Sequence, residues 1–478
     1  MLFTSFEFPV LLFFLGLIYY LVPGRVQWIV LLVCNVLFLS GNGKAAVLLF
    51  FMTGITWIFS AVINRCQNKK QRRQIFLLSL FFQVGIMLYF KLFCDNMPFG
   101  LAYYGLMTIS YQTEIYRKHT KWIANPLQLV TAVSFFPLLV QGPVTLYDNM
   151  EKILQTHRFQ MNRACFAIQR ILWGYFKKLA VADRIVPVVQ VIIGSPSEYT
   201  GLWVLLGMLF YAVQLYADFT GGIDITLGIA QFLGMEFPEN FNVPFTSKNL
   251  GEYWRRWHIS LGEWIKNYIF YPLSVSRLTC RLAKTVKKKS PSAGKRVPVY
   301  LASFAAWFVT GLWHGRQLHF IVWGLANCAV ILASRELKEV YDHFHKRYPG
   351  LKENMLYGYF QAVRTFLLVC VLRMTDCYQD VGLTIKMFIR MFTDPVRILP
   401  SDLLVSGMTL ADYIVLAVGI LLMYLVGKRK KKENLQQWYD GFSPVRKCTL
   451  CILTLFAVLI FGSYGIGYDA RQFIYNEV

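Results

Sequence analysis

The sequence predicts an all-α, polytopic integral membrane protein with one integrated membrane domain. Of its 478 residues, 56% are hydrophobic and 16% are charged, and the mean hydropathy is +0.44. A soluble domain of this length would carry more charge. From runs of about 20 apolar residues we expect roughly 10 to 13 membrane helices, together with re-entrant and amphipathic helices. Such runs recur from end to end, at 8–21, 45–62, 75–89, 411–426 and 450–461.

The net charge of +23 follows the positive-inside rule, so we expect the bilayer as the partner and no nucleic acid. The positive clusters lie in short loops between apolar runs, which predicts a multi-pass protein of the cell membrane with these loops in the cytoplasm. The first apolar run lacks a basic leader and a small-residue cleavage site, so we interpret it as the first membrane helix. The clusters are 65–73, 117–121, 277–296, 335–352 and 428–432.

We divide the chain into three successive segments at residues 95 and 400. Residues 1–95 predict four helices, separated by Pro23-Gly24, by Gly41-Asn42-Gly43 and by a basic loop at 64–73. Residues 96–400 are less regular, and residues 401–478 return to long apolar runs.

The stretch 202–235 carries acids inside an apolar run. Because Gly221-Gly222 interrupts it, we expect a broken helix bearing Asp218 and Asp224 at membrane depth. Two roles stay open for these carboxylates: they hold helices together through hydrogen bonds, or they shape a polar site.

Residues 236–273 are too polar and aromatic to span lipid, which indicates an interfacial helix or a segment packed inside the fold. The basic stretch 284–295, with Ser290-Pro291-Ser292, is expected to be a mobile loop.

A helical hairpin is predicted over 297–334, with His314 at its turn. Basic clusters flank both ends, so both ends should be cytoplasmic. Residues 297–312 rise roughly 24 Å as a helix, which places His314 deep in the membrane or toward its outer face. Gly315, the next residue, permits close approach of another chain or a substrate.

Histidine is the residue type that carries the chemical hypothesis. Four of the seven histidines lie in polar loops, whereas His258, His314 and His319 lie in aromatic or apolar surroundings. An imidazole can accept a proton from a hydroxyl near neutral pH. We find no Gly-x-Ser-x-Gly elbow, no phosphate-binding loop and no metal-ligand cluster of convincing spacing. The residues therefore support a histidine-assisted reaction in a membrane cavity.

Several motifs resemble the membrane-bound O-acyltransferase family, in its bacterial branch of alginate O-acetylation and teichoic acid D-alanyl transfer proteins. The motifs are QLYADFTGGID (214–224), FPENFN (237–242), WRRWHISL (254–261), YIFYPL (268–273), TGLWHG (310–315) and IVWG (321–324). Weaker matches are SFFPLLVQGP (134–143), GYFKKLAVAD (174–183) and YGIGYDARQFIY (464–475). The basic loop at 277–295 is longer than the family pattern leads us to expect.

The resemblance implies a role for each matched residue. His314 corresponds to the family's catalytic base at the floor of a central cavity, and His258 to a second histidine of the site. The motif residues around them are expected to bind substrate or shape the site, with residues 96–400 as the catalytic core. They are Asp218, Asn240, Arg255, Arg256, Trp257 and Trp313.

The resemblance also implies a reaction. We expect transfer of an acetyl group from a cytoplasmic thioester, acyl-CoA or an acyl carrier protein, toward hydroxyls of an extracytoplasmic polysaccharide, with no bound cofactor. An extracytoplasmic acyltransferase partner with a serine hydrolase-like fold is expected to receive the acyl group. The alternatives are D-alanyl transfer to teichoic acid, and a polysaccharide or lipid-linked sugar transporter.

Overall fold

The computed structural model describes residues 3, 5, 7–394, 398, 400–404 and 407–464. These residues form helices and no strand, apart from one isolated antiparallel bridge between Phe241 and Trp257. The predicted all-α, multi-pass membrane class is confirmed. Seven helical segments of the described chain are long and apolar enough to cross a membrane, fewer than the estimate from apolar runs. They are Gly24–Arg65, Lys69–Phe93, Leu202–Phe232, Leu318–Glu336, Met355–Tyr378, Leu410–Lys432 and Pro444–Phe461.

The described chain separates into two compact units. The first comprises Met1–Arg184, Tyr216–Glu239 and Lys432–Val478, and the second comprises Ile185–Leu215 and Asn240–Lys431. This division follows contacts in space, whereas the predicted divisions at 95 and 400 follow the sequence. Those two boundaries therefore stay a prediction, as does the expected central cavity. The terminal motif from residue 465 to 475 lies outside the described residues.

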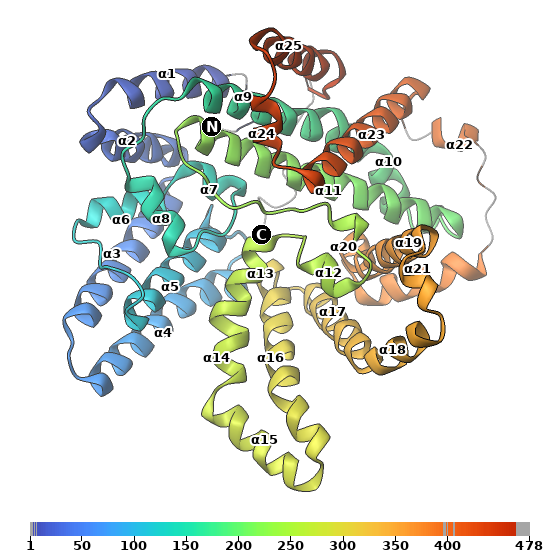
Figure 1. Ribbon diagram of the computed structural model, residues 1–478, viewed down its shortest axis with the longest axis horizontal. Helices are drawn as coiled ribbons and strands as arrows, with labels where there is room; N and C mark the ends of the chain where they lie inside the picture. Colours follow the sequence, from blue (N-terminus) through green and yellow to red (C-terminus); the bar gives the residue numbers. More distant parts are fainter. Residues whose placement is uncertain are drawn as a thin grey trace. The chain divides into compact units, whose positions relative to one another are not determined.

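The four predicted N-terminal helices are present in the first unit, where α3, α4 and α5 pack together (Figure 1). Asparagine side chains begin two of them: the Asn42 side chain accepts a hydrogen bond from the Ala45 amide, and the Asn68 side chain accepts two. The helices of this part are α1 Glu7–Leu21, α2 Gln27–Leu39, α3 Gly43–Arg65, α4 Lys69–Phe93, α5 Leu101–Arg117, α6 Pro126–Val133, α7 Phe136–Gln141, α8 Tyr147–Leu154 and α9 Met161–Tyr175.

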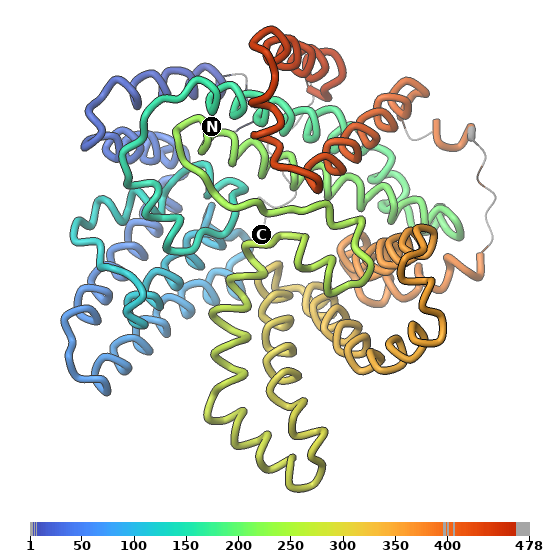
Figure 2. Tube along the Cα trace, viewed as in Figure 1, coloured from blue at the N-terminus to red at the C-terminus, as the bar shows by residue number. Residues whose placement is uncertain are grey.

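The remaining helices follow α9 along the chain (Figure 2). A π-helical turn, η3 Phe176–Ala182, continues α9. The helices after it are α10 Asp183–Gly194, α11 Leu202–Phe232, α12 Leu250–Trp254, α13 Ile259–Ile265, α14 Tyr271–Ser274, α15 Arg277–Lys289, α16 Pro291–His314, α17 Leu318–Glu336, α18 Lys338–Arg347, α19 Met355–Leu372, α20 Met374–Tyr378, α21 Val381–Thr393, α22 Pro400–Leu404, α23 Leu410–Lys432, α24 Leu435–Asp440 and α25 Pro444–Phe461.

The expected break at Gly221-Gly222 is wrong, because α11 is one uninterrupted helix of 31 residues. Gly221 instead allows two helices to approach closely. A Cβ on Gly221 would lie 2.9 Å from the carbonyl oxygen of Gly174, and one on Gly228 would lie 3.0 Å from that of Ala167. Small residues serve this purpose where membrane helices pack without a hydrophobic driving force.

Another expectation is corrected in the second unit. The basic stretch 284–295, expected to be a mobile loop, is helical, because α15 runs to Lys289 and the Ser290 side chain caps α16.

For the polar segment 236–273 two alternatives were open, an interfacial helix or packing inside the fold. Its central residues Asn240, Trp257 and His258 are buried, which agrees with the second alternative.

The predicted hairpin over 297–334 is confirmed as α16 and α17. The two helices touch at Gly311 and Gly324: a Cβ on Gly324 would lie 2.5 Å from the carbonyl oxygen of Trp307 and 3.3 Å from the Cα of Gly311. A backbone atom cannot move aside as a flexible side chain can, so the crossing depends on glycine at this position.

The substitution Gly324→Ala should destabilise the hairpin. The added methyl group has no room against the Trp307 carbonyl, and such overpacking costs about 1–3 kcal/mol. The melting temperature in detergent should fall by several degrees. The control is Gly54→Ala in α3, where a Cβ meets nothing within 4 Å and stability should be unchanged or slightly higher. Equal melting temperatures for both variants would contradict the close crossing.

Candidate functional site

His314 is the last residue of α16 and is half-buried at the tip of the hairpin. Two aromatic rings flank its imidazole. The Phe320 ring stacks on it with a centroid separation of 6.3 Å and an interplanar angle of 20°, and the Trp323 ring meets it edge-on at 4.9 Å. Gly315 is needed because the Phe320 ring occupies the space into which a Cβ would project. The close approach that glycine permits is thus an intramolecular one.

His258 is held by a buried amide. The Oδ1 of Asn240 accepts hydrogen bonds from the amide and the hydroxyl of Ser260, at 3.1 and 2.9 Å. The same oxygen lies 3.3 Å from the Nδ1 of His258. Because an amide oxygen only accepts, the hydrogen of the neutral imidazole is assigned to Nδ1 and the lone pair to Nε2.

The backbone at His258 is in the left-handed region, with φ +46°. A non-glycine residue with positive φ is uncommon and persists only where its surroundings enforce it. Here the enforcing contacts are backbone hydrogen bonds from Ile259 to the Asn240 carbonyl and from Asn242 to the Arg256 carbonyl, both 3.0 Å long. They join 240–242 to 256–260 and turn the His258 side chain into the unit.

Trp313 brings the two predicted histidines together. Its ring centroid lies 6.0 Å from that of His258 and 5.0 Å from that of its neighbour His314. The two histidines are far apart in sequence, so only folding places them against the same indole. That they serve one catalytic site stays a prediction.

Three further tryptophans of the second unit surround a buried arginine, Arg373. The guanidinium carbon of Arg373 lies 4.9, 5.6 and 6.0 Å from the ring centroids of Trp257, Trp323 and Trp254, respectively. Arg373 also forms an ion pair of 2.9 Å with Asp376. Cation–π contacts of this kind gain strength where water is excluded. The side chain therefore connects three tryptophans, of which Trp323 contacts the His314 ring and Trp257 precedes His258 in the chain.

Sequence analysis missed Arg373, although a signal was present. Arg373 and Asp376 are three residues apart in an apolar segment that could span the membrane, Met355–Tyr378. Charges at membrane depth that lie one helical turn apart predict a pair.

His258 is neutral at physiological pH. Burial lowers the pKa of its imidazole to about 3, with a smaller contribution from the positive charge of Arg373. A neutral imidazole can accept a proton or polarise a bound group, whereas an imidazolium ion could only donate.

Two predicted arginines of the second unit have other surroundings. Arg255 is exposed, and Arg256 is bound by Glu252 at 2.5 Å and by the Thr246 hydroxyl at 3.2 Å. Asp218 belongs to the first unit, where it forms a 2.7 Å ion pair with Lys178. This ion pair joins η3 to α11, as expected of the first of the two roles left open by the sequence, and the role in a polar site stays untested.

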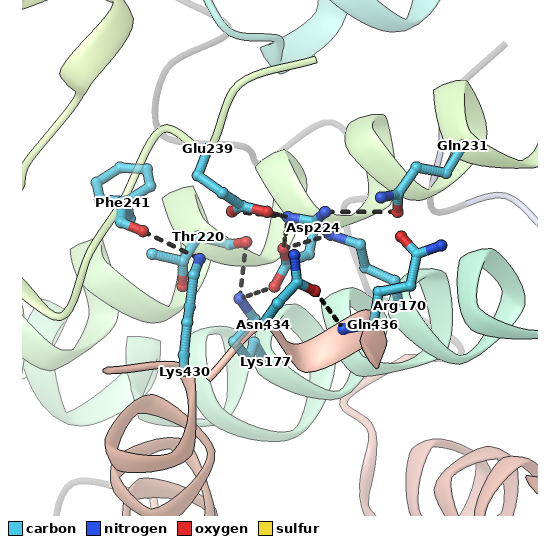
Figure 3. A network of polar contacts seen from close by, with 10 residues as sticks. All are labelled: Arg170, Lys177, Thr220, Asp224, Gln231, Glu239, Phe241, Lys430, Asn434 and Gln436. Atoms are coloured by element: carbon cyan, nitrogen blue, oxygen red, sulfur yellow. Dashed lines mark hydrogen bonds and ion pairs between the residues drawn. The ribbon is translucent and has the colours of Figure 1, made fainter. Parts of the chain in front are cut away.

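Another ion network, buried at Arg170 and Lys177 and exposed at Glu239, lies in the first unit (Figure 3). Arg170 bonds to Asp224 at 2.9 Å and to both carboxylate oxygens of Glu239 at 2.7 and 2.8 Å. Lys177 bonds to Asp224 at 2.6 Å and to the Thr220 carbonyl at 2.8 Å. Lys177 and Lys178, two adjacent lysines in an otherwise apolar stretch of the sequence, are thus the partners of Asp224 and Asp218 on α11.

His258, Trp313 and His314 lie in a segment that matches a known family. Residues 116–372 match the profile of MBOAT, the membrane-bound O-acyltransferase family. The match covers more than half of the chain, so the protein belongs to this family.

Among bacterial relatives, a "Probable alginate O-acetylase" of Azotobacter vinelandii is 28% identical over 71% of this chain and 64% of its own length. A peptidoglycan O-acetyltransferase of Helicobacter pylori is 26% identical over 53% of this chain and 50% of its own. A teichoic acid D-alanyltransferase of Bacillus subtilis is 27% identical over 51% of this chain and 59% of its own. The matched region thus spans less than two thirds of each of these relatives.

The stability of the protein should fall in acid because of His258. Its imidazole has a pKa of about 3 when folded and an ordinary value near 6.5 when unfolded. Above pH 6.5 the imidazole is neutral in both the folded and the unfolded protein, so its burial does not lower stability there. Below pH 6.5 the unfolded protein binds a proton that folded His258 does not, and the free energy of unfolding falls. At pH 5 the loss should be about 2 kcal/mol.

The variant His258→Asn tests this prediction, since asparagine accepts a positive φ and does not titrate. Melting temperatures of both proteins are followed from pH 8 to pH 5 in detergent. The wild type should lose more stability than the variant over this range. Parallel curves would show that His258 does not remain neutral in the folded protein.

Loss of Lys178 should destabilise the protein more than loss of Asp218. Lys178 is buried between Asp218 and Asp183, each at 2.7 Å, so Lys178→Met removes the cation that these two buried carboxylates share and should cost about 3–5 kcal/mol. Asp218→Asn leaves Asp183 in place and should cost less. The exposed pair of Lys338 and Asp342 supplies the control, since Lys338→Met should cost less than about 1 kcal/mol.

Chemical denaturation in mixed micelles ranks these three variants. If Asp218→Asn kept full stability and lost only catalytic turnover, Asp218 would belong to the reacting site and not to the helix pair.

Proposed function

We propose that this protein is a membrane O-acyltransferase that moves an acetyl group from a cytoplasmic thioester toward hydroxyls of an extracytoplasmic polysaccharide. The observation that carries the proposal is the convergence of His258 and His314 on Trp313, inside the segment that matches the family. The names of the relatives support acyl transfer to cell-envelope polymers. Of the three relatives described above, two are named for O-acetyl transfer.

His314 acts as the general base in the proposed reaction. Its imidazole accepts the proton of the acceptor hydroxyl while the hydroxyl oxygen attacks the thioester carbonyl. The carbon–sulfur bond then breaks, the oxygen ester forms, and the proton passes from His314 to the departing thiolate. His314 is half-buried, so the imidazole is open to a substrate at the tip of the hairpin.

His258 acts beside this base. Its Nδ1–H is directed to Asn240, which orients the ring, and the indole of Trp313 separates it from His314. Orientation of a second imidazole by a buried amide is the kind of support that keeps a polar site in one geometry. Asn240, Trp257 and Trp313 are the site-shaping residues, with Arg373 added by the structure.

The donor and the acceptor define the remaining parts of the proposal. The donor is an acyl thioester, on coenzyme A or on an acyl carrier protein, and acts as a co-substrate. The acceptor hydroxyl belongs to the polysaccharide or to an extracytoplasmic partner protein that passes the acyl group on. D-alanyl transfer is kept as the second candidate because a relative of this chain is a teichoic acid D-alanyltransferase.

The substitution His314→Ala should reduce acyl transfer by about 10²–10⁴-fold, the usual contribution of a general base. The control is His343→Ala in α18, where the side chain is exposed and transfer should be unchanged. Melting temperatures should match the wild type for both variants. Full transfer by a folded His314→Ala protein would exclude His314 as the base.

Reconstituted protein given either labelled acetyl thioester or an aminoacyl carrier protein identifies the donor. Label on an ester of the polymer or of a partner protein from the acetyl donor supports the proposal. Label from the aminoacyl donor alone supports D-alanyl transfer. Movement of an envelope sugar with no acyl-bond chemistry would instead favour a transporter.

A further inference from the structure

The helix α15 is a preformed element of the second unit. The Ser276 side chain begins it by accepting a hydrogen bond from the Thr279 amide. Thr279, in the first turn of the helix, is fully buried. At its other end α16 packs directly against it: a Cβ on Gly294 would lie 2.5 Å from the Cβ of Lys287. The chain runs out along α14, crosses through α15 and returns along α16, so that α15 forms the tip of this arm (Figures 1 and 2).

All charged side chains of α15 are positive, and no acidic residue lies near them in the sequence. No Asp or Glu occurs between residues 264 and 335. Within α15 six side chains are basic and all are exposed: Arg277, Arg281, Lys284, Lys287, Lys288 and Lys289. Spacings of three and four residues place Arg277, Arg281, Lys284 and Lys288 on one face.

Exposed leucines border this basic face. Leu278 and Leu282, one helical turn apart, are 70% and 45% exposed. Val275, just before the helix, is 74% exposed. The helix as a whole carries too much charge to cross hydrocarbon, so these apolar side chains are not explained by a membrane-spanning role. A basic face beside an apolar edge is the pattern of helices that lie in the plane of a membrane surface.

We propose that α15 docks on the anionic headgroups of the bilayer, with Leu278 and Leu282 inserted at the level of the acyl-chain boundary and the basic face bound to lipid phosphates. The exposed leucines favour a lipid surface over a soluble acidic protein, because a purely electrostatic partner would need only the basic face. Lysine and arginine near an anionic membrane surface each contribute to attraction that falls off within a Debye length.

Docking of α15 would hold the arm formed by α14, α15 and α16 at a fixed depth relative to the membrane surface. Docking of α15 at the surface sets how far α16 extends toward His314, at the other end of the same helix. The lipid composition of the membrane then influences the placement of the proposed base without a contact between lipid and site.

Cys280 provides the test, because it is exposed within α15, and Cys448 is the other exposed cysteine of the chain. The full-length protein is reconstituted into nanodiscs of phosphatidylcholine alone or with a minority of phosphatidylglycerol. Modification by an uncharged, polar maleimide is followed on each cysteine peptide by mass spectrometry. With phosphatidylglycerol present, Cys280 should react about tenfold more slowly and Cys448 should not change by as much, given the attraction expected of several basic side chains.

Two variants separate docking from a general effect of the charged surface. Arg277→Gln, Arg281→Gln, Lys284→Gln and Lys288→Gln together should abolish the protection, and Leu278→Ser with Leu282→Ser should reduce it. The matched control removes four exposed charges elsewhere in the second unit: Lys338→Gln, Lys346→Gln, Arg347→Gln and Lys352→Gln. This control should keep the protection, and raised salt should weaken the protection in the wild type.

Protection that persists in the α15 charge variant, or that is lost equally in the control variant, would overturn the proposal. So would protection of Cys280 by a purified acidic carrier protein in neutral nanodiscs together with no effect of phosphatidylglycerol, since the basic face would then serve a protein.

Discussion

Each charge that this chain buries needs a partner within the protein, because hydrocarbon offers none. The pairing of Lys178 with Asp218 and Asp183 meets this demand in the first unit, and the pairing of Arg373 with Asp376 meets it in the second. These contacts do more than neutralise charge. Arg373 also contacts three indoles, and one of them, Trp323, meets the His314 ring at 4.9 Å. A buried arginine is therefore linked through one tryptophan to the proposed base.

Local patterns were sufficient to predict much of the architecture. The four helices before residue 95 are separated by turn residues, and asparagines cap two of them. The hairpin that carries His314 lies between two basic clusters. Both features depend on residues close together in the chain. The charge of 284–295 alone predicts a mobile loop, whereas the spacing of its basic and apolar residues is helical. The caps at Ser276 and Ser290 are the local signals for its helices.

Long-range packing accounts for what sequence reasoning did not reach. Gly221 predicts a break when read alone, yet it is a contact point because Gly174 lies opposite. In the sequence Lys177 only interrupts an apolar run, whereas in the structure it forms an ion pair with Asp224. Likewise, motifs indicated His258 and His314 separately, but the shared contact with Trp313 depends on the fold. The resemblance to a family supplied these residues, and the packing supplied their neighbours.

The rings that flank His314 have a consequence for its motion. Phe320 stacks on one face of the imidazole and Trp323 meets it edge-on, so few side-chain rotamers are open to it. A base whose rotamer is already selected has little conformational entropy left to lose when a hydroxyl approaches. Gly315, by making room for the Phe320 ring, is what allows this restriction. A side chain at position 315 would therefore change the rate of the proposed proton transfer as well as the shape of the turn.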